Sequence, residues 1–74
     1  MNKNKIALWA KRCEVAALKR KPDYPENSPQ CSYLDGKAAA YSEAWAMLIF
    51  DGEYTPEEYN KANDEWIKKL EEGL

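Results

Sequence analysis

The sequence predicts an all-α fold, a small bundle of three helices. Between residues 28 and 50, apolar side chains recur at alternating steps of three and four, which places them on one side of an α-helix. They are Cys31, Leu34, Ala38, Tyr41, Trp45 and Leu48. The pairs Ser28-Pro29 and Thr55-Pro56 are typical helix starts. Each predicted helix also contains one of the three tryptophans.

The central helix is expected to span residues 29–50. Asp51-Gly52 should end it, because Gly52 readily adopts the left-handed conformation that follows a helix. Outside the apolar seam most of its side chains are still apolar or small, so we expect it to be the most buried of the three helices and to be enclosed on most sides. A ridge of small residues would let a neighbouring helix approach closely. This ridge consists of Gly36, Ala40 and Ala44.

The first helix is expected to span residues 3–21, because Pro22 disfavours helical geometry at the residue before it. Its expected apolar side consists of Ile6, Trp9, Ala10, Cys13, Ala16 and Ala17. Two prolines predict an extended connector over residues 22–27. Leu8 and Val15 lie outside the apolar side, either as ordinary exposed aliphatic residues or as a second, smaller contact surface.

The third helix, residues 56–72, has the clearest start. Thr55 and Glu58 form a capping-box pattern, and Tyr54 and Tyr59 can pack on each other around it. Its apolar stripe consists of Tyr59, Ala62, Trp66, Ile67 and Leu70. Gly73 is expected to close the helix, with Leu74 folding back onto the last turn.

Residues 1–74 form a single expected domain, and a chain of this length supports only a marginal core, so we expect self-association, as a homodimer for example. The short second connection favours antiparallel neighbours, whereas the first permits either an up-down-up bundle or an arm that reaches another subunit. The expected core consists of Trp9, Cys13, Leu34, Tyr41, Trp45, Leu48, Trp66 and Leu70.

The residue inventory argues against catalysis and against a bound cofactor. The chain has no histidine and only two cysteines, which cannot supply the four ligands of a structural zinc site. We expect Cys13 and Cys31 to be buried as small hydrophobic residues, with a disulfide as the alternative. The sequence contains neither a glycine-rich phosphate loop nor a serine with a base partner. Without an export signal or a membrane span, the expected location is cytoplasmic.

Charge is divided unevenly along the chain. Residues 1–22 have a net charge of +6 and residues 23–74 have a net charge of −8. The predicted basic face consists of Lys5, Lys11, Arg12, Lys19 and Arg20. The predicted acidic face consists of Asp51, Glu53, Glu57, Glu58, Asp64, Glu65, Glu71 and Glu72. Lys5, Arg12 and Lys19 repeat every seven residues, as do Glu58, Glu65 and Glu72, which predicts pairing of the two helices within or between subunits.

These observations favour a non-enzymatic protein-interaction or regulatory module that is homo-oligomeric. The first alternative is an acidic inhibitor whose third-helix face docks on a basic, nucleic-acid-binding partner protein. The second is direct binding of nucleic acid by the basic first helix. The acidic remainder of the chain disfavours the second alternative, because it repels a polyanion.

Overall fold

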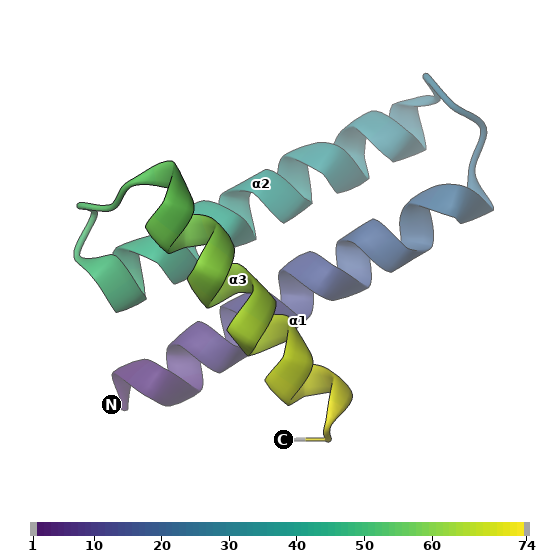
Figure 1. The fold of residues 1–74 in the computed structure, drawn as a ribbon. Helices are drawn as coiled ribbons and strands as arrows, with labels where there is room; N and C mark the ends of the chain where they lie inside the picture. Colours follow the sequence, from purple (N-terminus) through teal and green to yellow (C-terminus); the bar gives the residue numbers. More distant parts are fainter. Residues whose placement is uncertain (1, 74) are drawn as a thin grey trace.

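The computed structural model describes residues 2–73, and it confirms the predicted all-α fold. Its helices are α1 (Lys3–Arg20), α2 (Pro29–Phe50) and α3 (Pro56–Glu71), with a short 3₁₀ turn, η1 (Lys21–Asp23), after α1. Helices α1 and α2 lie side by side and antiparallel, and α3 crosses them obliquely near the end where α2 stops (Figure 1). The other half of the α1–α2 pair extends beyond α3.

Local capping chemistry explains the limits of α2, which are those predicted. The Ser28 hydroxyl accepts a hydrogen bond from the Cys31 amide, and Pro29 occupies the first turn. At the other end the left-handed cap is Asp51, with φ 54°, and Gly52 follows with φ 86°. The left-handed conformation therefore begins one residue earlier than the glycine alone indicates.

Helix α3 begins as predicted. The Thr55 hydroxyl accepts from the Glu58 amide, and the Glu58 carboxylate accepts from the Thr55 amide, which completes the capping box. The rings of Tyr54 and Tyr59 lie 5.6 Å apart between centroids, consistent with the predicted packing around the cap. The helix ends at Glu71, one residue before the predicted end, and Gly73 has a positive φ of 84°. The predicted contact of Leu74 lies outside the described residues.

The buried side of α1 differs from the prediction. It is formed by Ala7, Ala10, Lys11, Glu14 and Ala17. Trp9, which we expected in the core, is 54% exposed, and Ala16 is also exposed. The alanines allow α1 to lie close to α2, and the space beside Ala7 and Ala10 is filled by the indole of Trp45 from α2, so Trp9 is left outside it. Trp9 instead lies beside this interface, with its ring edge-on to Tyr41 at 5.3 Å.

The remaining core residues fall into two clusters. Trp45 is completely buried with Ala7, Ala10 and Ala46, and Leu34 is buried with Ala17 and Ala38 farther from α3. Tyr41, Leu48 and Trp66 pack against the first cluster and are partly buried. Cys13 and Leu70 are also partly buried. Of the eight predicted core residues, Leu34 and Trp45 are therefore fully buried, five are partly buried, and the prediction for Trp9 is wrong.

The outward side of α2 is exposed, which corrects the expectation that this helix is enclosed on most sides. Gly36, Ala40 and Ala44 are all exposed, and a Cβ atom added at Gly36 would meet nothing within 4 Å. No helix among residues 2–73 occupies the ridge that these residues form. Within one chain, α1 and α3 together cover only the inner side of α2.

Candidate functional site

A buried lysine lies where the three helices meet. Lys11 of α1 is 0% exposed, although we predicted it on a basic surface face. Its Nζ atom is 2.5 Å from Glu14 Oε1 and donates a hydrogen bond to Asn63 Oδ1 of α3 at 2.6 Å. The same ammonium lies 3.7 Å from the centroid of the Trp45 ring on α2. One side chain therefore contacts all three helices.

Burial of this ammonium is possible because its charge is compensated. A buried charge without partners costs several kcal/mol, on the order of 3–5 kcal/mol when a paired group is removed. Here the Glu14 carboxylate supplies the opposite charge, and the electron-rich face of Trp45 supplies a cation–π contact, worth about 2 kcal/mol when desolvated. The aliphatic stem of Lys11 also fills apolar space.

Trp45 is surrounded by aromatic side chains that face it edge-on. The centroids of Tyr59, Trp66 and Phe50 lie 5.4, 5.9 and 6.1 Å from it, with interplanar angles of 89°, 79° and 86°. Such pairs add about 0.5–1.5 kcal/mol each beyond the burial of area. The indole N–H has no hydrogen-bond partner within residues 2–73, so ring contacts and the Lys11 cation hold this side chain. Tyr59 also shares a hydrogen bond with Ser42 of α2.

Sequence reasoning missed this cluster because it counted large apolar residues and placed Lys11 on a basic surface face. The available signal was the 3-4-3 spacing of positions 7, 10, 14 and 17, which includes three alanines. That spacing marks the side of α1 that faces α2, and Lys11 borders it. The cluster is buried, so we expect it to stabilise the packing of α1, α2 and α3 against one another.

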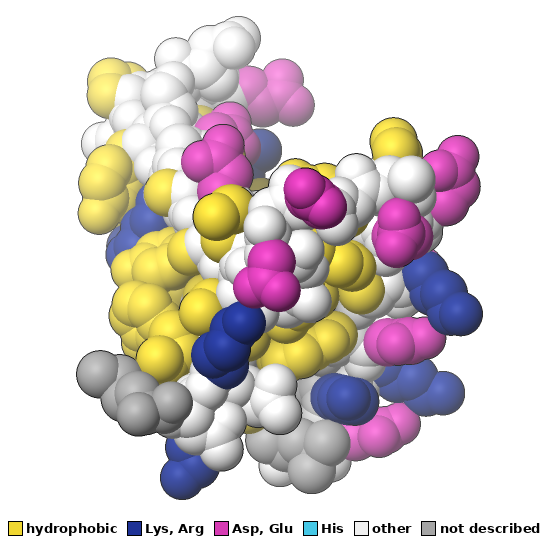
Figure 2. All heavy atoms as spheres, turned by 90° about the vertical axis from the view of Figure 1, so that its left-hand side faces the viewer, with side chains coloured by type: hydrophobic (Ala, Val, Ile, Leu, Met, Phe, Trp, Pro, Cys, Tyr) yellow, Lys and Arg dark blue, Asp and Glu magenta, His cyan; other side chains and the backbone are white. Residues whose placement is uncertain are grey.

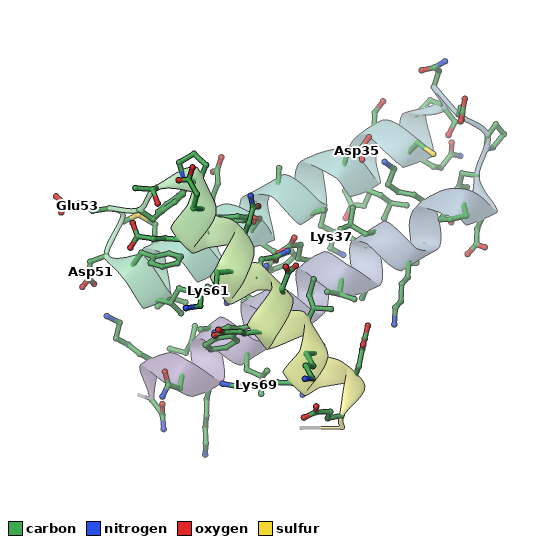
Figure 3. All side chains as sticks on the ribbon, in the orientation of Figure 1. Asp35, Lys37, Asp51, Glu53, Lys61 and Lys69 are labelled. Atoms are coloured by element: carbon green, nitrogen blue, oxygen red, sulfur yellow. The ribbon has the colours of Figure 1, made fainter. Side chains whose placement is uncertain are left out.

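The structure places all eight residues of the predicted acidic face on the surface. Asp51 and Glu53 extend away from the turn between α2 and α3 (Figure 3). The end of the molecule that contains this turn carries acidic side chains around a group of hydrophobic ones (Figure 2). On α3 the acidic residues lie opposite the packed stripe, interspersed with Lys61 and Lys68, which reduce the net negative charge of that face.

The predicted basic face is smaller than expected. Lys5, Arg12, Lys19 and Arg20 are exposed, whereas Lys11 is buried. Two further cations of this region form ion pairs: Lys3 lies 3.2 Å from Asp51, and Lys21 lies 2.5 Å from Asp35. The hydrogen bond that Lys21 donates to the Asp35 carboxylate, together with the negative charge of that carboxylate, raises the pKa of Lys21 above its usual value.

The predicted pairing of heptad-spaced charges is wrong for one chain. Because α3 crosses α1 instead of running parallel to it, the two rows of charge do not lie along each other (Figure 1). The side-chain ion pairs among residues 2–73 include Lys3 with Asp51, Lys11 with Glu14 and Lys21 with Asp35.

The surface of residues 2–73 has shallow grooves. One of them, of about 510 Å³, lies between α2 and the start of α3 and is lined by Ala39, Ser42, Tyr54, Pro56 and Tyr59 among others. It is open to solvent along its length. Within residues 2–73, no three histidine, cysteine or acidic side chains are grouped as metal ligands would be.

Both cysteines are free thiols. Cys31 is buried, as predicted, and its Sγ lies 3.5 Å from the carbonyl oxygen of Lys21. Cys13 is only partly buried.

The helices of the described part of the chain are too short or too polar to cross a membrane. Comparisons of the chain with protein-family models, with curated proteins and with solved structures gave no match.

Proposed function

We propose that this chain is a self-associating protein-interaction module that acts without catalysis, through exposed helix faces. The observation that carries the proposal is the extent of its surface. The chain exposes 5408 Å² for a mass of 8.5 kDa. A self-contained monomer of that mass exposes about 4,700 Å². The excess of about 700 Å² is close to the roughly 800 Å² that each partner buries in a standard interface.

The dimensions of the molecule agree with this excess. Its Cα radius of gyration is 12.9 Å. A compact domain of 74 residues has a radius of gyration of about 11.3 Å. The difference arises because α3 covers one end of the α1–α2 pair and leaves the other end bare (Figure 1). Large hydrophobic side chains remain exposed on α2, where Tyr33 is 64% and Met47 59% exposed.

Light scattering over a concentration series tests self-association. We expect a mass near twice the 8.5 kDa of one chain at micromolar to millimolar protein. A mass of one chain throughout that range contradicts the homo-oligomeric part of the proposal. Measuring at low and high salt separates apolar association, which salt preserves, from charge pairing, which salt weakens.

A second candidate is docking of the acidic face on a basic partner protein, and the exposure of all eight acidic residues favours it. An oligolysine peptide is a suitable probe of this face. We expect weak binding that salt abolishes, and that is lost when Glu58, Glu65 and Glu72 are all changed to lysine. Binding that survives the triple change contradicts this candidate.

Nucleic-acid binding has less support than self-association or docking of the acidic face. Of the cations on α1, Lys11 is buried and Lys3 is paired with Asp51. A phosphate-binding surface would give affinity for duplex or single-stranded DNA that falls steeply with salt. Titration of labelled DNA at two salt concentrations tests this candidate, and we expect no binding even at the lower one, which would rule it out.

A further inference from the structure

The outward side of α2 carries a second line of residues, which we name the outward seam. It consists of Tyr33, Gly36, Ala40, Ala44 and Met47. All five residues are exposed. At 3.6 residues per turn, each of them lies within about 40° of the direction of Ala40. Trp45 and Leu34, which face the core, point more than about 90° away from that direction.

The outward seam is apolar along its centre and charged at its edges. Gly36, Ala40 and Ala44 lie in the middle, with the large side chains of Tyr33 and Met47 at the two ends. Lys37 and Glu43 flank it on opposite sides. An apolar centre with a polar border is the composition of a protein–protein contact.

The order of residues in the seam is symmetric about Ala40. The large residues stand seven positions before and after it, and small residues stand four positions before and after it. When a second α2 is laid antiparallel on the first with the two Ala40 residues in contact, Gly36 meets Ala44 and Tyr33 meets Met47 at each end. Small residues opposite each other let the axes approach to about 8 Å, and a methionine sulfur packs favourably on an aromatic ring.

We propose that two copies of this chain pair antiparallel through their outward seams, about a two-fold axis at Ala40. This inference rests on the proposed self-association and names its interface. The contact is self-complementary, as a two-fold dimer requires. A Cβ atom added at Gly36 would meet nothing within 4 Å, so the space above this position of the seam is open to a second helix. The excess surface of about 700 Å² per chain is close to what each partner buries in a standard interface of about 20–30 residues a side, so the five seam residues form the centre of a wider contact.

Charge introduced at the centre of the seam tests the proposal. We expect Ala40→Glu to weaken dimerisation at least 100-fold, because it places two carboxylates against each other without water. Ala40 is exposed in one chain, so the helix content by circular dichroism should not change. The matched control is Ala16→Glu, the same substitution at an exposed position of α1. It should leave the dimer mass unchanged.

Disulfide cross-linking tests the direction of pairing. In a chain with Cys13→Ala and Cys31→Ala, Gly36→Cys and Ala44→Cys are made separately, and the two proteins are mixed and oxidised with diamide. Antiparallel pairing brings residue 36 of one copy beside residue 44 of the other, within the Cα separation of roughly 4.4–6.8 Å that a disulfide spans. We expect the mixed 36–44 disulfide as the main covalent dimer.

The outcomes separate this inference from the proposed function. A dimeric wild type whose mass is unchanged by Ala40→Glu overturns the outward-seam interface and leaves self-association intact. A preference for 36–36 and 44–44 disulfides over the mixed one overturns the antiparallel arrangement. A wild type that is monomeric at all concentrations overturns the inference and the self-association together, whereas binding of the acidic face remains a separate measurement.

Discussion

Lys11 is the residue whose contacts hold the three helices together where they meet. Its ammonium group is fully buried and contacts Glu14, Asn63 and Trp45, so no solvent replaces a partner that is removed. A chain of 74 residues has a free energy of unfolding of about 4–11 kcal/mol. The loss of one buried charge partner, on the order of 3–5 kcal/mol, is a large share of that total.

Replacing Lys11 alone should therefore be severe. We expect Lys11→Met to lower the free energy of unfolding by about 3–5 kcal/mol, because Glu14 is left without its cation in a largely buried position. Urea denaturation followed by circular dichroism measures the change. The double variant Lys11→Met/Glu14→Leu removes both charges and should recover most of the loss. Equal destabilisation in the single and double variants would contradict a paired buried charge.

Lys21 and Asp35 form an exposed pair with a different consequence. The pKa of Lys21 is raised, so the ammonium form is favoured in the folded state. The contribution to stability is fully present below the usual lysine pKa of about 10.4, and it is lost as the pH rises through the higher folded value. NMR titration of the Lys21 side chain should give a lower pKa in Asp35→Asn than in the wild type.

At the scale of elements, α3 is the least firmly held helix. None of its described residues is fully buried, and it meets the rest of the chain through Lys11, Ser42 and the rings around Trp45. Elements with few buried contacts open most readily. We expect amide hydrogen exchange to be faster in α3 than in the central turns of α1 and α2.

The capping box should control that opening. Thr55→Ala removes the acceptor for the Glu58 amide, and we expect it to cost about 1 kcal/mol and to increase exchange mainly in α3. Ser32→Ala, which removes an exposed hydroxyl from α2, is the matched control. Equal exchange in α3 for the two variants would contradict the role of the cap.

The helices also show which structural features can be predicted from the sequence and which cannot. The starts of α2 and α3 follow from Ser28-Pro29 and Thr55-Pro56, and the end of α2 follows from Asp51-Gly52, since caps are made by neighbouring residues. The buried side of α1 was not predicted, because it depends on which side chains fit against α2. Alanines at positions 7, 10 and 17 allow close approach, and Trp45 of α2, not Trp9, fills the space beside Ala7 and Ala10. The position of Lys11 required knowledge of the Trp45 ring and of Asn63, which are distant in sequence.

At the scale of the whole molecule, the prediction of an all-α fold held, but the crossing of α3 over α1 was not foreseen. The prediction assumed near-parallel helices, and the heptad spacing of Lys5 and Glu58 supported that assumption. The observed crossing brings Trp66 and Tyr59 onto Trp45 and leaves the outward side of α2 in solvent. Burial of the aromatic rings decides the angle, because surface charge pairs contribute only tenths of a kcal/mol to about 1 kcal/mol.

The proposed pairing of two copies predicts a thermal stability that depends on protein concentration. We expect the Tm of the wild type to rise as protein concentration increases, because association stabilises the folded state by mass action. Calorimetry over a hundredfold range of concentration measures this. The Tm of Ala40→Glu should be independent of concentration over the same range. A constant Tm for the wild type would contradict the proposed dimer.

The three tryptophans differ in their access to solvent: Trp9 is 54% exposed, Trp66 is partly buried and Trp45 is 0% exposed. Their fluorescence should therefore be quenched to different extents by a molecule dissolved in the solvent. A soluble quencher such as acrylamide should reach Trp9 at once. It should reach Trp45 only after α3 has lifted away, so the slow component of quenching reports the frequency of that opening in an unlabelled, unmodified protein.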